Sequence, residues 1–386
     1  MMKAAHITSW CAAGTVADTI VIGDVLTPPA PRGRQVLIRV HAAAVNVDDV
    51  ALLQDTAGGG RFFHASKPSP SRPLVGGCEF AGEVVAVGPD VDNASASSTR
   101  VGDRVCGVQD VAGLSGGGKM AGTWAELTVS PEGALAKLPD GLSFREAAAV
   151  GMAAHVVGDM LKRADSYLRV AKSDDESLPP RSCRCLVIGA SGGLGTVLLQ
   201  MLRRRENVHT VAVCSGSNAA TVRRLGADEV VDYKAGAISD QLADAPKFDV
   251  VFDFVGGAET EQSAVALLRR GGMFLTAVGP WQNLGDRKLS WSEWVGWACG
   301  LSGRLIRGNR RCACRMPYRY SMSMEPLPLN AENFHAAVVD GGARGEIAME
   351  VSFTETALRD AIRRVASRHS GGKVIINMDL SASSAS

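Results

Sequence analysis

Three glycines spaced three residues apart, Gly189, Gly192 and Gly195, are the clearest sign of a binding site in the sequence. They follow an apolar run typical of a β-strand, residues 184–188, and precede residues that favour a helix. A strand that enters a helix through a glycine turn presents backbone N–H groups and the positive end of the helix dipole to one point. An anion there gains about 0.3–2 kcal/mol. The residues expected to hold a pyrophosphate are Gly189, Ser191, Gly192, Gly193, Leu194 and Gly195.

The spacing of these glycines is GxxGxxG, not the GxGxxG of the common dinucleotide fingerprint. A turn that only joins a strand to a packed helix is therefore the alternative. The residues that follow favour the nucleotide site, because strand-like and helix-like runs alternate. Strands are expected at 208–214, 229–232, 248–254 and 273–278, and helices at 218–225 and 259–270. With residues 184–188 these make five buried strands, a pattern typical of a doubly wound parallel sheet.

The residues after the second strand predict which dinucleotide binds. An NAD site carries Asp or Glu there, about 20 residues past the glycines, to hold the ribose 2′-hydroxyl group. No carboxylate occurs between residues 208 and 224, whereas Ser215, Ser217 and Asn218 offer hydrogen bonds and Arg223 and Arg224 offer charge. A hydrogen bond to a charged group contributes about 1.5–3 kcal/mol, so the sequence favours NADPH. For the two arginines a solvated helix face is the alternative. Dinucleotides bind at the carboxyl ends of strands, so Val255 and Val278 are expected cofactor contacts as well.

Composition narrows the class of protein. The 386 residues suffice for two domains, and 46% hydrophobic with 21% charged residues is typical of a globular protein. A net charge of +1 argues against a nucleic-acid binder. The nine cysteines lack the spacing of a zinc knuckle, and reduced thiols favour a cytoplasmic location. We also expect no leader peptide and no membrane-spanning run.

A tryptophan-rich stretch, residues 291–305, leads into six arginines between residues 304 and 319. Aromatic and basic residues together can bind a membrane surface. One interpretation is therefore a peripheral membrane contact through residues 291–319. The favoured alternative is a helix packed between domains or subunits, followed by a solvated basic loop.

Residues 1–152 lack the alternation of strands and helices and instead show the pattern of short strands with glycine turns. This pattern predicts an antiparallel barrel-like domain. Ser143 and Glu146 form a capping box that begins a long helix at the crossover to the second domain, residues 153–317. Residues 318–386 supply a helix and a closing strand that we expect to return to the first domain.

The segments GCEFAGEVVAVG, VIGASGGLGTVLLQ, LGADEVVDYKAG, FDVVFDFVGG and GGKVIINM resemble the medium-chain dehydrogenase/reductases. Within them the chain is similar to the zinc-free quinone oxidoreductase-like branch, and most of all to mitochondrial, NADPH-dependent members linked to ubiquinone metabolism. The resemblance implies a Rossmann-type sheet inserted into a GroES-like β-barrel catalytic domain, with mitochondria as the alternative location. It places Ser215 and Tyr233 near the 2′-phosphate and has Lys373 reach the cofactor. We also expect a homodimer.

Zinc enzymes of this family have ligands where this chain has Asn46 and Cys78, and a third cysteine near Ala153. One soft ligand cannot hold zinc, which needs three protein ligands, so we expect no metal. Without a Lewis acid, the hydride acceptor must itself be electrophilic, such as a quinone or an α,β-unsaturated carbonyl.

The resemblance sets the VNxxD motif, and with it Asn46, beside the nicotinamide. Asn46 is the first catalytic candidate, as a donor to the oxygen of the acceptor or to the nicotinamide ribose, with a backbone turn as the alternative. Asp49 is the second candidate, expected to orient the loop rather than to donate a proton. His41 and His155 are other proton sources, or else core histidines.

The sequence thus predicts an NADPH-dependent, zinc-independent oxidoreductase that transfers hydride to a quinone or an enone. A catalytically weak NADPH-binding scaffold and an enoyl-thioester reductase are the alternatives. The scaffold is suggested by departures from the family pattern. Val156 stands where a threonine is common, Gly151 replaces a proline, and a tyrosine after the VNxxD motif is missing.

Overall fold

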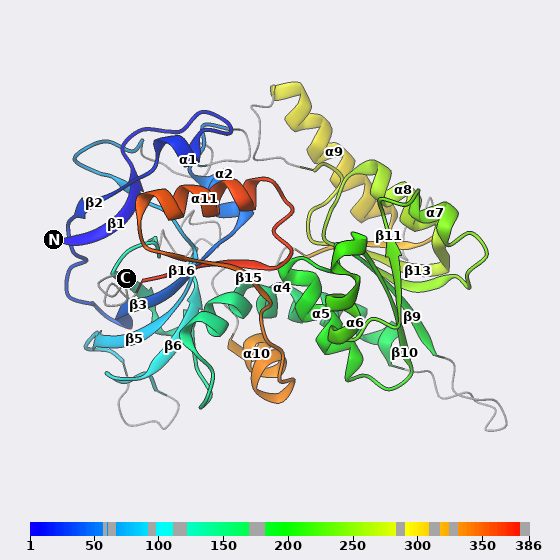
Figure 1. Cartoon of the computed structure of the whole chain (residues 1–386), viewed down its shortest axis with the longest axis horizontal. Coiled ribbons are helices and arrows are strands. Elements are labelled where there is room, and N and C mark those ends of the chain that lie inside the picture. The colour runs from blue at the N-terminus through cyan, green and yellow to red at the C-terminus, as the bar shows by residue number, and fades with distance from the viewer. Residues whose placement is uncertain are drawn as a thin grey trace. The chain divides into compact units, whose positions relative to one another are not determined.

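The computed structural model describes residues 1–56, 60, 67–91, 98–110, 122–169, 182–282, 290–308, 317–323 and 331–378. These residues divide into two compact units (Figure 1). The first unit combines the described parts of 1–155 with 331–378, and the second has those of 156–282 and 290–323. The second unit is therefore inserted into the sequence of the first, and the helix α4 (Phe144–Leu168) carries the chain from one to the other. The capping box at its start is confirmed, since Ser143 N donates to Glu146 Oε2 at 2.9 Å and Glu146 N to Ser143 Oγ at 3.3 Å.

The first unit is built on short, mostly antiparallel strands, as predicted. One sheet has the order β2-β1-β4, and a larger one has the order β15-β16-β3-β5-β6-β8, with β7 also paired to β3. The strands are β1 (Met2–Ile7), β2 (Val21–Val25), β3 (Gln35–Val45), β4 (Leu74–Val75), β5 (Glu79–Val87), β6 (Arg104–Val108), β7 (Leu127–Pro131), β8 (Leu135–Lys137), β15 (Ile347–Ser352) and β16 (Lys373–Asn377). The helices are α1 (Val16–Thr19), α2 (Val47–Leu52), α10 (Ala331–Phe334) and α11 (Glu355–Ala366). Alternating apolar residues of these strands, Phe80 among them, form the core together with Trp124 from the segment before β7.

The pairing of β3 with its two neighbours positions the residues of chemical interest. The last strand, β16, returns to the first unit as expected and pairs antiparallel with β3, with Val374 opposite Val45. On the other side of β3, Phe80 of β5 lies opposite Ala43. The end of β3, the start of β5 and the start of β16 therefore meet. Asn46, Glu79 and Lys373 lie at these three strand ends.

The second unit contains the predicted parallel sheet, with the order β11-β10-β9-β12-β13-β14 among its described residues. Its strands are β9 (Cys183–Ile188), β10 (Val208–Cys214), β11 (Glu229–Asp232), β12 (Phe248–Asp253), β13 (Leu268–Thr276) and β14 (Arg319–Met322). Its helices are α5 (Gly193–Arg203), α6 (Ala219–Leu225), α7 (Ile238–Gln241), α8 (Ala258–Leu267) and α9 (Trp291–Arg307). β9 lies between β10 and β12 in the sheet (Figure 1).

Two predictions about this sheet were wrong in detail. The helix expected at 259–270 ends at Leu267, and β13 begins at once, five residues before the expected start. Arg269 explains the early strand, because its guanidinium pairs with the buried Asp249 of β12 instead of pointing to solvent. The sixth strand, β14, was not predicted. It pairs parallel to β13, with Phe274 opposite Tyr320, and it belongs to the second unit although we expected the boundary at residue 317.

The tryptophan-rich stretch forms α9, whose inner face packs against the second unit through Trp297 and Leu301. Arg304 donates to Glu261 Oε2 at 2.7 Å, and Tyr318 donates to Glu261 Oε1 at 2.9 Å, so this helix is tied to α8 and to the approach to β14. Residues 309–316 of the expected basic segment lie outside the described residues. No helix in the described ranges combines the length and the apolar character needed to cross a membrane.

Candidate nucleotide site and candidate active site

The glycine turn follows β9 and begins α5, as predicted. Gly189 has φ +80°, a conformation that a side chain disfavours. A Cβ built on Gly195 would lie 2.5 Å from the carbonyl oxygen of Gly189, so the first turn of the helix packs directly on the loop. Gly192, the N-cap, has ordinary extended angles, and a Cβ there would meet only that same oxygen, at 3.3 Å. A small side chain at Gly192 would therefore meet little of the fold, and α5 begins there with N–H groups that have no partner within the helix.

Hydroxyl and amide groups gather beside this turn. Ser215 follows β10, and its Oγ lies 2.9 Å from Ser217 Oγ. Asn218 Nδ2 donates to Ser215 Oγ at 3.2 Å and to Ser191 Oγ at 3.1 Å. The structure therefore joins Ser191 of the glycine turn to Ser215 and Ser217 at the end of β10. Together with the free helix end, this polar cluster fits the phosphates of a nicotinamide dinucleotide.

Tyr233 and Arg224 lie near the same strand end. Tyr233 donates its backbone N–H to the carbonyl of Cys214 at 3.2 Å, and its side chain is exposed. Arg224 is in the last turn of α6, also exposed, and its carbonyl accepts a bond from Arg203. The predicted contacts of both residues with a 2′-phosphate remain predictions.

Sequence reasoning missed a carboxylate at this strand end. Asp232 is the last residue of β11 and lies opposite Cys214 of β10. A Cβ built on Gly216 would lie 2.5 Å from Asp232 Oδ2, so the carboxylate borders the loop after β10. Asp232 lies beyond residues 208–224, where the acid of an NAD site was expected. The signal was present in the run EVVD, since neighbouring parallel strands end at the same edge of a sheet.

The ends of β12 and β13 are held together by Asp253. This buried carboxylate accepts from Val255 N at 3.0 Å, from Gly256 N at 2.9 Å and from Thr276 Oγ1 at 2.8 Å. Thr276 Oγ1 in turn accepts from Val278 N at 3.1 Å. Val255 also borders Gly189, whose built Cβ would lie 3.2 Å from Val255 Cγ2. The two predicted valines therefore lie on one hydrogen-bonded edge of the sheet, beside the glycine turn.

A second cluster of polar side chains lies in the first unit. Lys373 Nζ is 2.5 Å from Glu79 Oε2 and 2.5 Å from Asn46 Oδ1. Asn46 Nδ2 donates to Glu79 Oε2 at 3.1 Å, and Met152 N donates to Glu79 Oε1 at 2.6 Å. Glu79 is fully buried and Lys373 is 7% exposed. Lys373 was predicted to reach the cofactor. The structure places its ammonium on Asn46 and Glu79, and its contact with the cofactor remains a prediction.

Asp49 is the third residue of α2, and its side chain forms a capping box with Asn46. Its Oδ2 accepts from Asn46 N at 2.7 Å, so Asp49 orients the loop that carries Asn46. Burial raises the pKa of the Asp49 carboxyl to about 7, although the neighbouring Cys78 thiol and the Asn46 N–H act in the opposite direction. Burial and the Asp49 carboxyl likewise raise the pKa of the Cys78 thiol, which stays protonated.

The Asp49 carboxyl makes a testable contribution to stability. Its folded pKa is raised, so the native state binds a proton that the unfolded chain releases between about pH 4 and pH 7. This contribution is complete below about pH 4 and is lost as the pH rises through about 7, at about 1.4 kcal/mol for each pKa unit. Urea unfolding across this range should show the wild type losing stability relative to Asp49→Asn, whose side chain does not titrate. Parallel profiles for the two proteins would show that Asp49 is not buried as described.

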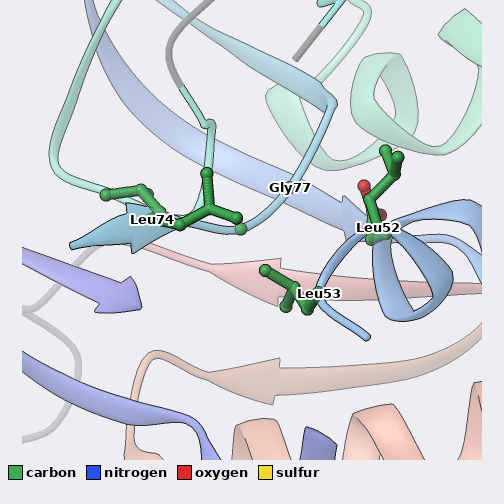
Figure 2. Close-up of a pocket in the computed structure, with 7 residues that line it drawn as sticks. Leu52, Leu53, Leu74 and Gly77 are labelled. Atoms are coloured by element: carbon green, nitrogen blue, oxygen red, sulfur yellow. The ribbon is translucent and has the colours of Figure 1, made fainter. Parts of the chain in front are cut away.

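A small hollow adjoins this cluster (Figure 2). Leu53 and Leu52 of the α2 segment lie on one side of it, and Leu74 and Gly77 lie on the other. Asp49, Val75 and Gly76 complete the lining. The hollow is thus apolar apart from one carboxyl group.

The two histidines considered as proton sources, His41 and His155, contact residues outside the Asn46 cluster. His41 stacks on Phe144, with ring centroids 4.5 Å apart. His155 is 1% exposed inside α4, and its carbonyl accepts from Asn333 Nδ2 at 3.1 Å. Gly151, where the family often has proline, packs against Glu79, since its built Cβ would lie 3.2 Å from Glu79 Oε1.

The residues around Asn46 do not fit a zinc ion. Asn46 and Cys78 lie together, with Nδ2 and Sγ 3.8 Å apart. The described residues contain no group of three or more His, Cys, Asp or Glu side chains placed to hold a metal. A cation is also present already, because the Lys373 ammonium lies on Glu79 and Asn46. A zinc ion beside it would be repelled.

Comparison with known proteins agrees with this architecture. Residues 32–140 match the alcohol dehydrogenase GroES-like domain, and residues 225–376 match the zinc-binding dehydrogenase family. The chain belongs to the medium-chain dehydrogenase/reductase superfamily. Superfamily relatives include the mitochondrial NAD(P)H oxidoreductase RTN4IP1 of Danio rerio, 28% identical over 360 residues that cover 89% of this chain and 84% of that protein. The trans-enoyl reductase RAP2 of Pyricularia oryzae is 34% identical over 215 residues, which cover 55% of this chain and 54% of that protein.

Solved structures of the superfamily share the fold. The quinone oxidoreductase of Coxiella burnetii superposes with a TM-score of 0.72 at 22% identity, over 98% of this chain and 99% of the other. The predicted fold, a Rossmann-type parallel sheet with a GroES-like domain, is thereby confirmed. The protein is an oxidoreductase of this superfamily.

Proposed function

We propose that the protein is an NADPH-dependent, zinc-independent reductase of quinones or α,β-unsaturated carbonyl compounds. The observation that carries this proposal is the Asn46 cluster, in which an amide stands at the position of a metal ligand and a lysine ammonium lies on it. Such a site has no Lewis acid to activate an ordinary ketone. It suits acceptors whose carbonyl groups are already conjugated, because a few hydrogen bonds stabilise the charge that develops on their oxygen.

The chemistry balances without a metal. A bound reduced nicotinamide supplies a hydride, which is two electrons and one proton. In an enone the hydride forms a C–H bond at the β-carbon, the C=C π electrons move toward the carbonyl, and the oxygen becomes negative. Asn46 Nδ2 donates a hydrogen bond to that oxygen, and a proton from water completes the reduction. A quinone gains the same two electrons and two protons to become a quinol.

Steady-state assays with purified protein and an added zinc chelator test this function. We expect NADPH to be oxidised saturably by at least one acceptor from a panel of quinones and 2-alkenals, and we expect Asn46→Ser to lower kcat by about 10²-fold. Binding of NADPH without turnover of any acceptor would support a nucleotide-binding scaffold instead, and would overturn the proposal.

The choice of NADPH has its own test. The polar cluster of Ser191, Ser215 and Ser217 supports a 2′-phosphate, whereas Asp232 nearby works against it. We expect NADPH to bind at least about 10-fold more tightly than NADH, because several hydrogen bonds to one charged group outweigh one screened repulsion. Ser215→Asp should reverse the preference, since a carboxylate there accepts from a ribose 2′-hydroxyl and repels a phosphate. Calorimetric titration with both nucleotides measures this, and equal affinities in the wild type would contradict it.

An enoyl-thioester reductase is the second candidate. It is favoured by the likeness to a trans-enoyl reductase, which has the highest identity among the relatives described above. Hydride addition to an enoyl thioester uses the same donor geometry as addition to an enone. A kcat/KM for a 2-enoyl thioester well above that for 2-alkenals and quinones would favour this function.

We further propose a homodimer and, through residues 291–319, a surface that contacts other molecules. The outer face of α9 supports this, because Val295, Leu305 and Ile306 are exposed there. Sedimentation of the protein alone, and then with anionic lipid vesicles, distinguishes self-association from membrane contact.

Two observations point to different cellular locations. The name of the RTN4IP1 relative favours mitochondria, whereas the free cysteines of the described residues fit the cytoplasm that we predicted. Imaging of a tagged chain in cells would decide between the two locations.

A further inference from the structure

Lys373 provides a fixed positive charge beside Asn46, the residue that stands where the resemblance puts a metal ligand of the zinc enzymes. It is the first residue of β16, and the pairing of Val374 with Val45 brings it beside Asn46. Its ammonium contacts Glu79 Oε2 and Asn46 Oδ1, both at 2.5 Å. Lys373 and Glu79 are both buried, and taking two charges out of water offsets much of their attraction. Stability is therefore a weak explanation for this pair.

The charges around Asn46 determine the orientation of its amide group. An ammonium can only donate hydrogen bonds, and a carboxylate can only accept them. Asn46 Oδ1 must therefore face Lys373, and Nδ2 must face Glu79, from which it is 3.1 Å away. The other neighbour of Nδ2 is Cys78 Sγ at 3.8 Å, and sulfur is a weak acceptor. One N–H of the amide is thus held by Glu79, and the other is available to a stronger acceptor.

Neutral neighbours would not hold the amide in this way. An asparagine between groups that both donate and accept can exchange its oxygen and nitrogen by rotating about its last bond. The ammonium prevents this rotation and also polarises the amide, which strengthens the hydrogen bond that the free N–H can donate.

We propose that Lys373, paired with Glu79, is the positioning residue that turns Asn46 Nδ2 toward the carbonyl oxygen of the acceptor. A fixed ammonium thus takes over part of the role that a metal ion has in zinc-dependent members. The inference rests on the proposed function, because it names the group that prepares Asn46 for it. It also replaces the cofactor contact that the resemblance implies for Lys373, because the ammonium lies on Asn46 and Glu79. Charge at residue 373 is then required for turnover and dispensable for nucleotide binding.

The test removes both charges together, so that neither is left buried alone. In Lys373→Met/Glu79→Gln we expect kcat for the best quinone or enone to fall by about 10²–10³-fold, while the Kd of NADPH stays within about 3-fold of the wild type. Lys137→Met is the matched control. Lys137 is in the same unit and also has two acceptors, Asp103 Oδ2 at 2.9 Å and Ser98 O at 2.7 Å. Its kcat should match the wild type.

Chemical rescue separates positioning from a merely structural role. Methylammonium added to Lys373→Ala should raise kcat saturably, by at least about 10-fold, and should leave Lys137→Met unchanged. Circular dichroism shows whether the double variant is folded. If it is not, the positioning role is tested by the rescue of Lys373→Ala and by Lys373→Arg, which keeps the charge and should keep most of the activity. A double variant as active as the wild type, or Lys373→Ala without rescue, would overturn the inference.

Failure of the proposed function gives a different result. If the wild type turns over no quinone, enone or enoyl thioester, the function is wrong, and the orientation of the amide is then read by NMR. With ¹⁵N-labelled asparagine, and Asn46→Asp to assign the signal, the Asn46 side-chain protons should exchange slowly in the wild type and fast in the double variant. Equal exchange would overturn the positioning role itself.

Discussion

Gly192→Val is expected to abolish nicotinamide nucleotide binding while leaving the protein folded. Gly192 has ordinary extended angles, and the only atom near its built Cβ is the carbonyl oxygen of Gly189 at 3.3 Å. A valine there fits the fold with a small shift but covers the start of α5 with three carbon atoms. A pyrophosphate would lose both its approach to the backbone and the helix N-terminus. The Kd of NADPH should rise by at least about 100-fold, which is about 2.7 kcal/mol.

The controls for this variant come from the same chain. Gly133→Val introduces the same side chain at an exposed position with no atom within 4 Å of the built Cβ, and it should bind NADPH as the wild type does. Gly195→Val should instead unfold the second unit, because a Cβ there would lie only 2.5 Å from the backbone oxygen of Gly189. Calorimetric titration and circular dichroism together measure these outcomes. Normal binding by a folded Gly192→Val protein would place the phosphate site elsewhere.

Asp253→Ala should destabilise the second unit by about 3–5 kcal/mol. The carboxylate is fully buried and satisfies the N–H groups of Val255 and Gly256 and the hydroxyl of Thr276. Alanine leaves the Gly256 N–H and the Thr276 hydroxyl buried without this acceptor. The loops that carry Val255 and Val278 should also loosen, so NADPH affinity should fall with stability.

Urea unfolding followed by circular dichroism measures the loss, with the exposed Asp244→Ala as the matched control. The control should unfold at the wild-type midpoint. An Asp253→Ala protein that unfolds at the same urea concentration as the control would contradict the role of this carboxylate.

Local patterns predicted the parts of the fold that depend on short-range chemistry. The strand at 208–214 and the capping box at Ser143 follow from apolar runs and from residues three apart, and the structure has both. The glycine turn was equally visible, because Gly189 and Gly195 meet strict local demands on backbone angle and space.

Long-range pairing accounts for what the sequence did not reveal. The early start of β13 depends on an ion pair between Arg269 and Asp249 of another strand. Asp232 borders the loop after β10 only because β11 pairs with β10. The contact between Lys373 and Glu79 joins residues 294 positions apart in the sequence through the register of β16, β3 and β5. No spacing along the chain predicts such a pair. Asn46, Asp49 and Lys373 of the candidate cluster could be named from the sequence and the resemblance, but the contacts that join Lys373 to Asn46 and Glu79 could not.

Stopped-flow measurement of a single turnover tests the central claim most directly. Wild-type protein would be loaded with NADPH that carries deuterium or hydrogen at the reactive C4 position, and mixed with excess quinone or 2-alkenal in the presence of a zinc chelator. We predict that the reduced nicotinamide disappears at a rate that saturates with the acceptor and is slower with deuterium. A bound nucleotide that no acceptor oxidises, or an oxidation that stops when zinc is chelated, would contradict a zinc-free hydride transfer.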